Sequence, residues 1–225
     1  KMPGSVGYTA MAAAALVGAT PASQRDADAA LSKALGYLVK NQKDNGAIFS
    51  NERFVTYETS AAISALAVAR RAEHRGAQVK ARDYLASTQI AGSEADPSFG
   101  GFPYKSKTPQ AADLSNLQFA VDALARGELP ADSPVWKRVQ SYLKRVQNRS
   151  ETNTEARELP KPGGQDGEKV KVVAGDDGGG YYAPDQSKAD MKARPDGTYE
   201  LVSYGSMTYA LPKCLLLAGV DPAAS

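Results

Sequence analysis

Two kinds of helical pattern alternate along this chain. One kind is apolar over most of its surface, as in residues 57–66, where Ala, Ile, Leu, Ser and Thr dominate. The other kind is amphipathic, as in residues 26–42, where one apolar stripe crosses a charged helix at positions Ala30, Leu31, Ala34, Leu35 and Leu38. A helix buried on several sides, next to one buried on a single side, is what two concentric layers of helices require.

The alternation predicts seven helices in four rounds. We expect apolar helices near residues 7–18, 57–66, 113–129 and 204–219, and amphipathic helices near residues 26–42, 77–89 and 134–147. Glycine turns separate the rounds, at Gly46, at Gly100-Gly101 and at Gly178-Gly179-Gly180. Pro212 lies within the last helix, which we expect it to kink or divide.

The repeated pair of unlike helices predicts an all-α fold, an α/α toroid of about three and a half helical hairpins with inner and outer rings. We expect residues 1–225 to form this single domain, possibly an incomplete ring, because the last inner helix has no outer partner. An open α-solenoid is the alternative, and the turns do not decide between the two. Leu215, Leu216 and Leu217 would keep one bare side, so we expect a protein partner, a second copy, or further chain to cover it.

Two segments depart from the helical pattern. Residues 149–175 are rich in Glu, Lys, Thr, Pro and Gly, and we expect a polar, solvated insertion, leaving open whether it is disordered. Asp196-Gly197 lies between polar and β-prone residues, which is typical of a small hairpin.

Composition excludes several classes of function. A net charge of +2 is too small to indicate nucleic-acid binding. A single cysteine, Cys214, excludes an internal disulfide, and a single histidine, His74, leaves little room for a zinc centre, so we expect no metal and no cofactor. No apolar run reaches the roughly 18 residues of a membrane span.

The sequence does not decide in which cellular compartment the protein is located. Residues 11–19 and the following Thr20-Pro21-Ala22-Ser23 could pass for the core and cleavage site of a signal peptide, but the segment also fits the helical repeat, which we favour. The chain could therefore be cytoplasmic, or exported after loss of a targeting segment.

The repeated phrases resemble the terpenoid cyclase / protein prenyltransferase superfamily, and in particular its prenyltransferase and squalene-oxidase repeat. The similarity lies in Lys33-Ala34, Tyr37-Leu38-Val39, Gln42 and Gly46, in Lys80-Ala81, Tyr84-Leu85, Gln89 and Gly100-Gly101-Phe102, and more loosely in Trp136-Lys137, Tyr142-Leu143, Gln147 and Gly179-Gly180-Tyr181. It covers most of the chain outside the insertion. It implies the toroid, and it says little about the reaction.

The resemblance implies a catalytic acid, but the family's acidic signatures are incomplete here. Squalene–hopene cyclases protonate an alkene with an Asp-x-Asp-Asp motif, and Asp113-Leu114-Ser115-Asn116 keeps only its first aspartate. Asp113 is favoured as a helix N-cap. The weak catalytic candidates are Asp113, Asp177 and Glu58, with Asp122 as a further carboxylate.

Aromatic residues near the turns and the starts of the inner helices predict a ligand site. In a toroid they would meet at one mouth, and the candidate ligand-binding residues are Tyr57, Tyr104, Asn116, Phe119, Tyr181, Tyr204 and Met207. The favoured hypothesis is a divergent toroid that binds an apolar, isoprenoid-like small molecule or a partner protein there. The alternatives are an active cyclase-like enzyme that uses a non-standard acid, and a purely structural scaffold in which the tyrosines only seal the loops.

Overall fold

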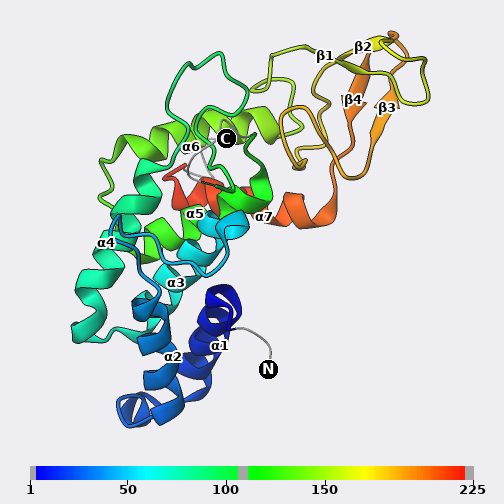
Figure 1. The fold of residues 1–225 in the computed structure, drawn as a ribbon. Helices are drawn as coiled ribbons and strands as arrows, with labels where there is room; N and C mark the ends of the chain where they lie inside the picture. Colours follow the sequence, from blue (N-terminus) through cyan, green and yellow to red (C-terminus); the bar gives the residue numbers. More distant parts are fainter. Residues whose placement is uncertain (1–3, 106–110, 221–225) are drawn as a thin grey trace. The chain divides into compact units, whose positions relative to one another are not determined.

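The protein combines helices with a β-sheet. The computed structural model describes residues 4–105 and 111–220, and within these it has seven α-helices and a four-stranded mixed sheet (Figure 1). The prediction of an all-α toroid is therefore wrong, because the sheet gives the chain a mixed α/β fold.

The described chain divides into two compact units. The N-terminal unit comprises residues 4–89, 102–105 and 119–133, and the C-terminal unit comprises residues 90–101, 111–118 and 134–220. Helix α5, Leu114–Arg126, contributes residues to both units. The β-sheet belongs to the C-terminal unit alone.

Helices build the N-terminal unit. They are α1 (Val6–Ala19), α2 (Ala29–Lys40), α3 (Val55–Ala69) and α4 (Arg75–Ser87), with the short 3₁₀ helices η1 (Ala22–Gln24), η2 (Glu52–Phe54) and η3 (Ala72–His74). Helix α3 packs against both α1 and α4, and α2 packs against α1. These helices confirm the ranges that periodicity predicts, to within a few residues at each end.

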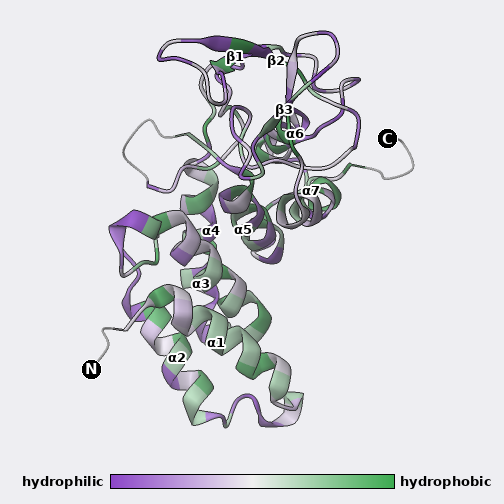
Figure 2. Cartoon of the chain, turned by 90° about the vertical axis from the view of Figure 1, so that its right-hand side faces the viewer, coloured by the Kyte–Doolittle hydropathy of each residue, from purple (hydrophilic) through white to green (hydrophobic). Residues whose placement is uncertain are grey.

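The two helix types differ in charge and burial as the sequence indicates. In α2, the Asp28 carboxylate caps the first turn by accepting the backbone N–H groups of Ala30 and Leu31, and the stripe of Leu31, Leu35 and Leu38 is buried. Helix α1 has no charged residue, and Figure 2 shows it pale to green along its length. Helix α3 buries nine of its residues, as expected of a helix covered on more than one side.

The glycine turns allow the chain to lie directly against a helix backbone. Gly46 has φ +96°, and a Cβ there would lie 2.5 Å from the carbonyl oxygen of Lys80 in α4. Gly100 has φ +87°, and a Cβ there would lie 1.8 Å from the carbonyl oxygen of Arg138. Only glycine tolerates both the left-handed backbone and the close approach. The repeated turns thus attach each loop to a helix that follows it in the chain.

The C-terminal unit joins two further helices to the sheet. They are α6 (Pro134–Val146) and α7 (Gly205–Leu217), and the strands are β1 (Arg157–Pro160), β2 (Lys169–Val172), β3 (Met191–Ala193) and β4 (Tyr199–Leu201). The strand order is β1-β2-β4-β3, in which β1/β2 and β3/β4 are antiparallel and β2/β4 are parallel. Helix α7 continues through Pro212, so the expected division of this helix does not occur.

All four strands come from two segments: residues 149–175, and the hairpin around Asp196-Gly197. Residues 149–175 contain β1 and β2, whose connection is closed by a hydrogen bond of 2.9 Å from the Lys161 N–H to the Glu168 carbonyl and by an ion pair of 2.6 Å between their side chains. A disordered insertion is therefore excluded. The hairpin predicted around Asp196-Gly197 is confirmed, because β3 and β4 pair antiparallel on either side of it.

Candidate functional site

An aromatic concavity lies in the N-terminal unit, between the start of α1 and the start of α3. It has a volume of about 1100 Å³, and we call it the aromatic groove. Its principal lining residues are Tyr8, Met11, Phe54, Tyr57, Glu58 and Tyr104. Two of the predicted ligand-binding residues, Tyr57 and Tyr104, thus line one hollow.

Aromatic contacts form one side of the aromatic groove. The ring of Tyr57 lies 5.6 Å from that of Tyr104 and 4.8 Å from that of Phe119, the second pair meeting edge to face at 62°. Two hydrogen bonds hold the Tyr104 segment beside α3, because the Thr56 N–H donates to the Tyr104 carbonyl and the Thr56 hydroxyl donates to the Pro103 carbonyl. The structure therefore brings together Tyr57, Tyr104 and Phe119 as one cluster.

The carboxylate of Glu58 holds the polar end of the aromatic groove together. Its Oε1 accepts the hydroxyls of Ser5 (3.2 Å) and Ser50 (3.0 Å) and the N–H of Gly7 (3.4 Å), while Oε2 accepts the N–H groups of Ser50 (2.6 Å) and Asn51 (2.9 Å). Five donor groups thus converge on this nearly buried side chain, and hydrogen bonds to a carboxylate are among the stronger ones in proteins. Glu58 thereby fixes the start of α1 and the loop before η2 against α3, and both of its carboxylate oxygens are engaged by the protein.

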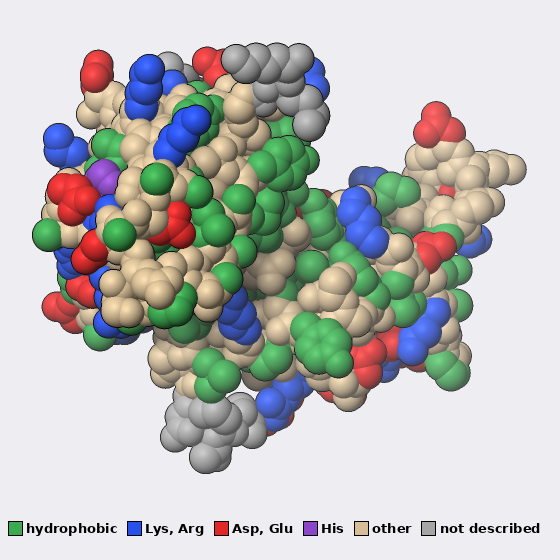
Figure 3. Space-filling view, turned by 90° about the horizontal axis from the view of Figure 1, so that it is seen from below, with side chains coloured by type: hydrophobic (Ala, Val, Ile, Leu, Met, Phe, Trp, Pro, Cys, Tyr) green, Lys and Arg blue, Asp and Glu red, His purple; other side chains and the backbone are tan. Residues whose placement is uncertain are grey.

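Large apolar side chains are exposed around the aromatic groove. Tyr8 is 76% exposed, Met11 52% and Phe54 46%, although residues of this size are normally covered. Figure 3 shows that hydrophobic side chains also lie uncovered on the face seen from below. The groove can therefore bury more apolar surface when a ligand enters it.

The other predicted ligand-binding residues belong to the C-terminal unit. Asn116 is fully buried, Tyr181 is 2% exposed and Met207 is 5% exposed, so they offer almost no free surface to a ligand. Burial raises the pKa of Tyr181 to about 12. Tyr204 is half-buried, and its pKa is raised by burial and then by the charge of Asp113.

The remaining carboxylates proposed as acids have structural partners. Asp113 precedes α5 and is 3% exposed, and its Oδ1 accepts the Asn116 N–H at 2.7 Å, which is N-cap geometry. Asp177 Oδ1 accepts the Gly179 N–H and the Ser203 hydroxyl, each at 2.8 Å. Asp122 forms an ion pair of 2.7 Å with Arg126 in α5.

Sequence reasoning missed three of the groove's apolar residues as ligand contacts. Tyr8 and Met11 are three positions apart on α1, and Phe54 lies three positions before Tyr57. On one helix, as for Tyr8 and Met11 in α1, a spacing of three places side chains on the same face, so the sequence indicates that these two lie together, whereas Phe54 belongs to η2. What it could not show is that this face is left exposed.

Two further findings concern membranes and metals. Among residues 4–105 and 111–220, no helix combines the length and the apolar character needed to cross a bilayer. In the same described residues, no group of three His, Cys, Asp or Glu side chains is placed to hold a metal ion.

Comparison with known proteins leaves the resemblance untested. No protein-family model matches this sequence, and no curated protein matches it either. The similarity to the terpenoid cyclase superfamily therefore stays a prediction.

Proposed function

We propose that the aromatic groove binds an apolar, isoprenoid-like small molecule. One observation carries the proposal: a hollow of about 1100 Å³ is lined by Tyr8, Met11, Phe54, Tyr57 and Tyr104, and three of these side chains are about half exposed or more. Burying apolar area stabilises a complex by about 25 cal/mol per Å² before the costs of association. Small-molecule sites are typically concave, apolar and few per protein.

Binding without catalysis is favoured over an enzyme with a non-standard acid. The groove's nearly buried carboxylate, Glu58, is engaged by five donor groups from four residues, and the Asp113 carboxylate caps α5. A general acid needs a proton directed at the substrate. The arrangement around Glu58 instead supports a rigid groove that presents its aromatic rings.

Titration with farnesol, a neutral isoprenoid alcohol, tests the proposal by calorimetry and by the shift in Tm. We expect saturable binding that the Tyr8→Ser variant weakens by about tenfold, because an aromatic contact worth roughly 1.4 kcal/mol is lost. Tyr209→Ser is the matched control, since Tyr209 is 84% exposed on α7 and lies outside the groove. Absence of binding, or equal weakening by both variants, would contradict the proposal.

A further inference from the structure

A second hollow of the N-terminal unit lies at the end of α3, whereas the aromatic groove lies at its start. It has a volume of about 630 Å³, within the range of small-molecule sites. Four of its nine lining residues are arginines, Arg70, Arg71, Arg75 and Arg126, and Glu128 is its single acidic lining residue. We call it the arginine pocket.

Ordinary stabilisation explains part of this arginine content. Helices α3 and α5 both end at the pocket, and positive side chains are favourable beside the partly negative C-terminus of a helix. Arg126 pairs with Asp122 at 2.7 Å, and Arg75 pairs with Glu128 at 2.6 Å. The Arg70 guanidinium pairs with no other described side chain.

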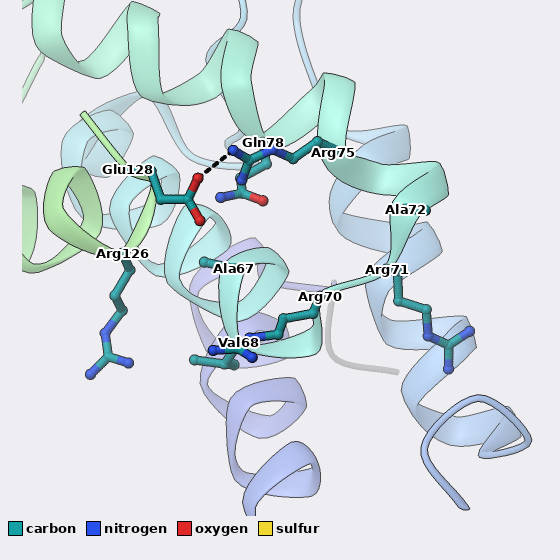
Figure 4. Close-up of a pocket in the computed structure, with 9 residues that line it drawn as sticks. All are labelled: Ala67, Val68, Arg70, Arg71, Ala72, Arg75, Gln78, Arg126 and Glu128. Carbon is teal, nitrogen blue, oxygen red and sulfur yellow. Dashed lines mark hydrogen bonds and ion pairs between the residues drawn. The ribbon is translucent and has the colours of Figure 1, made fainter. Parts of the chain in front are cut away.

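One buried donor in the arginine pocket remains unexplained by this stabilisation. Gln78 is 4% exposed, and its Nε2 has no hydrogen-bond partner among the described residues. The Arg71 guanidinium is accounted for separately: its Nη2 donates to the Arg25 carbonyl at 2.6 Å, its Nε lies 3.7 Å from the Asp26 carboxylate, and in Figure 4 it points away from Gln78 and Glu128. A buried donor without an acceptor costs about 1–3 kcal/mol, and native interiors rarely contain one. The Gln78 donor would be satisfied by an acceptor, which an oxygen-rich anion supplies.

The Glu128 carboxylate shows where an anion can sit. In Figure 4, Arg75 reaches from α4 to Glu128, and the Gln78 amide lies beside the same guanidinium. Arg70 extends across the last turn of α3 towards Val68 in this view. The Arg75 and Glu128 side chains are 46% and 70% exposed, and an exposed ion pair of this kind contributes less than about 1 kcal/mol, so a ligand oxyanion can displace Glu128.

We propose that the arginine pocket binds a small oxyanion with two or more negative charges, a phosphate or a multiple carboxylate. Its oxygens would accept a hydrogen bond from Gln78 Nε2 and take the place of Glu128 at Arg75, with Arg70 adding charge at the mouth. The planar guanidinium group suits both anions, because its parallel N–H groups match two oxygens at once. The inference is independent of the ligand in the aromatic groove.

Calorimetric titration with inorganic phosphate and with citrate tests the inference, against sodium chloride at the same ionic strength. We expect saturable binding of at least one multivalent anion and none of chloride. Binding of phosphate alone, or of citrate alone, identifies which oxyanion the pocket prefers. Binding of neither anion, or equal heats with chloride, overturns the inference.

Four variants locate the binding. Arg70→Ala should weaken binding by about fivefold, equivalent to roughly 1 kcal/mol, whereas Arg53→Ala, which removes the same charge outside the pocket, should leave it unchanged. Glu128→Gln should tighten binding, because the internal competitor for Arg75 loses its charge. Gln78→Leu should weaken binding without lowering the Tm of the free protein, because it removes an unpaired buried amide. Equal weakening by Arg70→Ala and Arg53→Ala would show unspecific attraction and contradict the proposed site.

Discussion

The backbone N–H of Asn51 donates a hydrogen bond of 2.9 Å to the carboxylate of Glu58, seven residues later in the chain. Ser50 donates to the same carboxylate through its N–H. Ser5, which is the N-cap residue of α1, donates to it through its hydroxyl. One side chain in the first turn of α3 thus joins three segments of the N-terminal unit. This relationship explains why a glutamate occupies an otherwise mostly apolar helix.

Glu58→Gln should lower the free energy of unfolding by about 2–3 kcal/mol. The new amide nitrogen would replace one carboxylate oxygen and face N–H and O–H donors that would then lack an acceptor. Urea denaturation measures the change. Glu52→Gln is the control, because Glu52 is an exposed carboxylate of the same groove, and it should stay within about 0.5 kcal/mol. An unchanged stability of Glu58→Gln would show that the hydrogen bonds around it do not support the groove.

Gly100→Ala should destabilise the protein by about 3 kcal/mol or more. A Cβ at Gly100 would meet the Arg138 carbonyl oxygen at 1.8 Å, in addition to the strain of φ +87°. Gly197 provides a matched control, because its φ of +83° is similar and no atom lies within 4 Å of an added Cβ. Gly197→Ala should therefore cost only the backbone strain, about 1–2 kcal/mol. Equal costs in thermal unfolding would mean that the close packing against α6 contributes nothing.

Asp113→Ala should cost about 1 kcal/mol of stability, and Asp113→Asn should cost much less. Asparagine keeps a side-chain oxygen that can accept the Asn116 N–H, so the N-cap survives without the charge. Chemical denaturation of the two variants separates a capping role from one that depends on an ionisable group. If Asp113→Asn were as destabilising as Asp113→Ala, the capping interpretation would be contradicted.

The stability of the C-terminal unit should fall as the pH rises from 10 to 12. Burial raises the pKa of Tyr181 to about 12, whereas an unfolded tyrosine ionises near pH 10. Above pH 10 the unfolded chain therefore loses a proton that the folded protein keeps, which favours unfolding until the folded pKa is passed.

Urea titrations at pH 9 and pH 11 measure this loss. Tyr181→Phe should show a smaller difference between the two pH values than the unaltered protein, because it removes one of the groups responsible. Tyr209→Phe is the control, since Tyr209 is exposed, and its pH dependence should match that of the unaltered protein. An equal pH dependence for Tyr181→Phe would contradict the role of burial at this position.

The helices were predictable because each carries its own periodic pattern. The stripe of Leu31, Leu35 and Leu38 and the Asp28 cap are readable within a single stretch of chain. In the sheet, only the β3/β4 hairpin had such a local signal, the turn at Asp196-Gly197. Strand β2 alternates Lys169, Val170, Lys171 and Val172 over only four residues, and its partner β4 lies more than 25 residues further along. Pairing over such a distance leaves no local signal in the sequence.

The candidate site was partly predictable for the same reason. Tyr57 and Tyr104 were identified from their places at a helix start and after a glycine turn, and they do line one groove. Tyr8 and Met11 were missed as ligand contacts because their exposure depends on how α1 packs against α3, which is a tertiary property. Tyr181 also follows a glycine turn, and Met207 also lies near a helix start, yet both side chains are buried in the C-terminal unit.

The methionine methyl groups provide the most direct test of the aromatic groove. Met11 lines it and is 52% exposed, whereas Met207 is 5% exposed in the C-terminal unit. In protein labelled with ¹³C at the methionine methyls, farnesol should shift the Met11 resonance in a saturable way and leave Met207 unchanged. A Met11 resonance that does not move, or a larger shift at Met207, would contradict ligand binding in the aromatic groove.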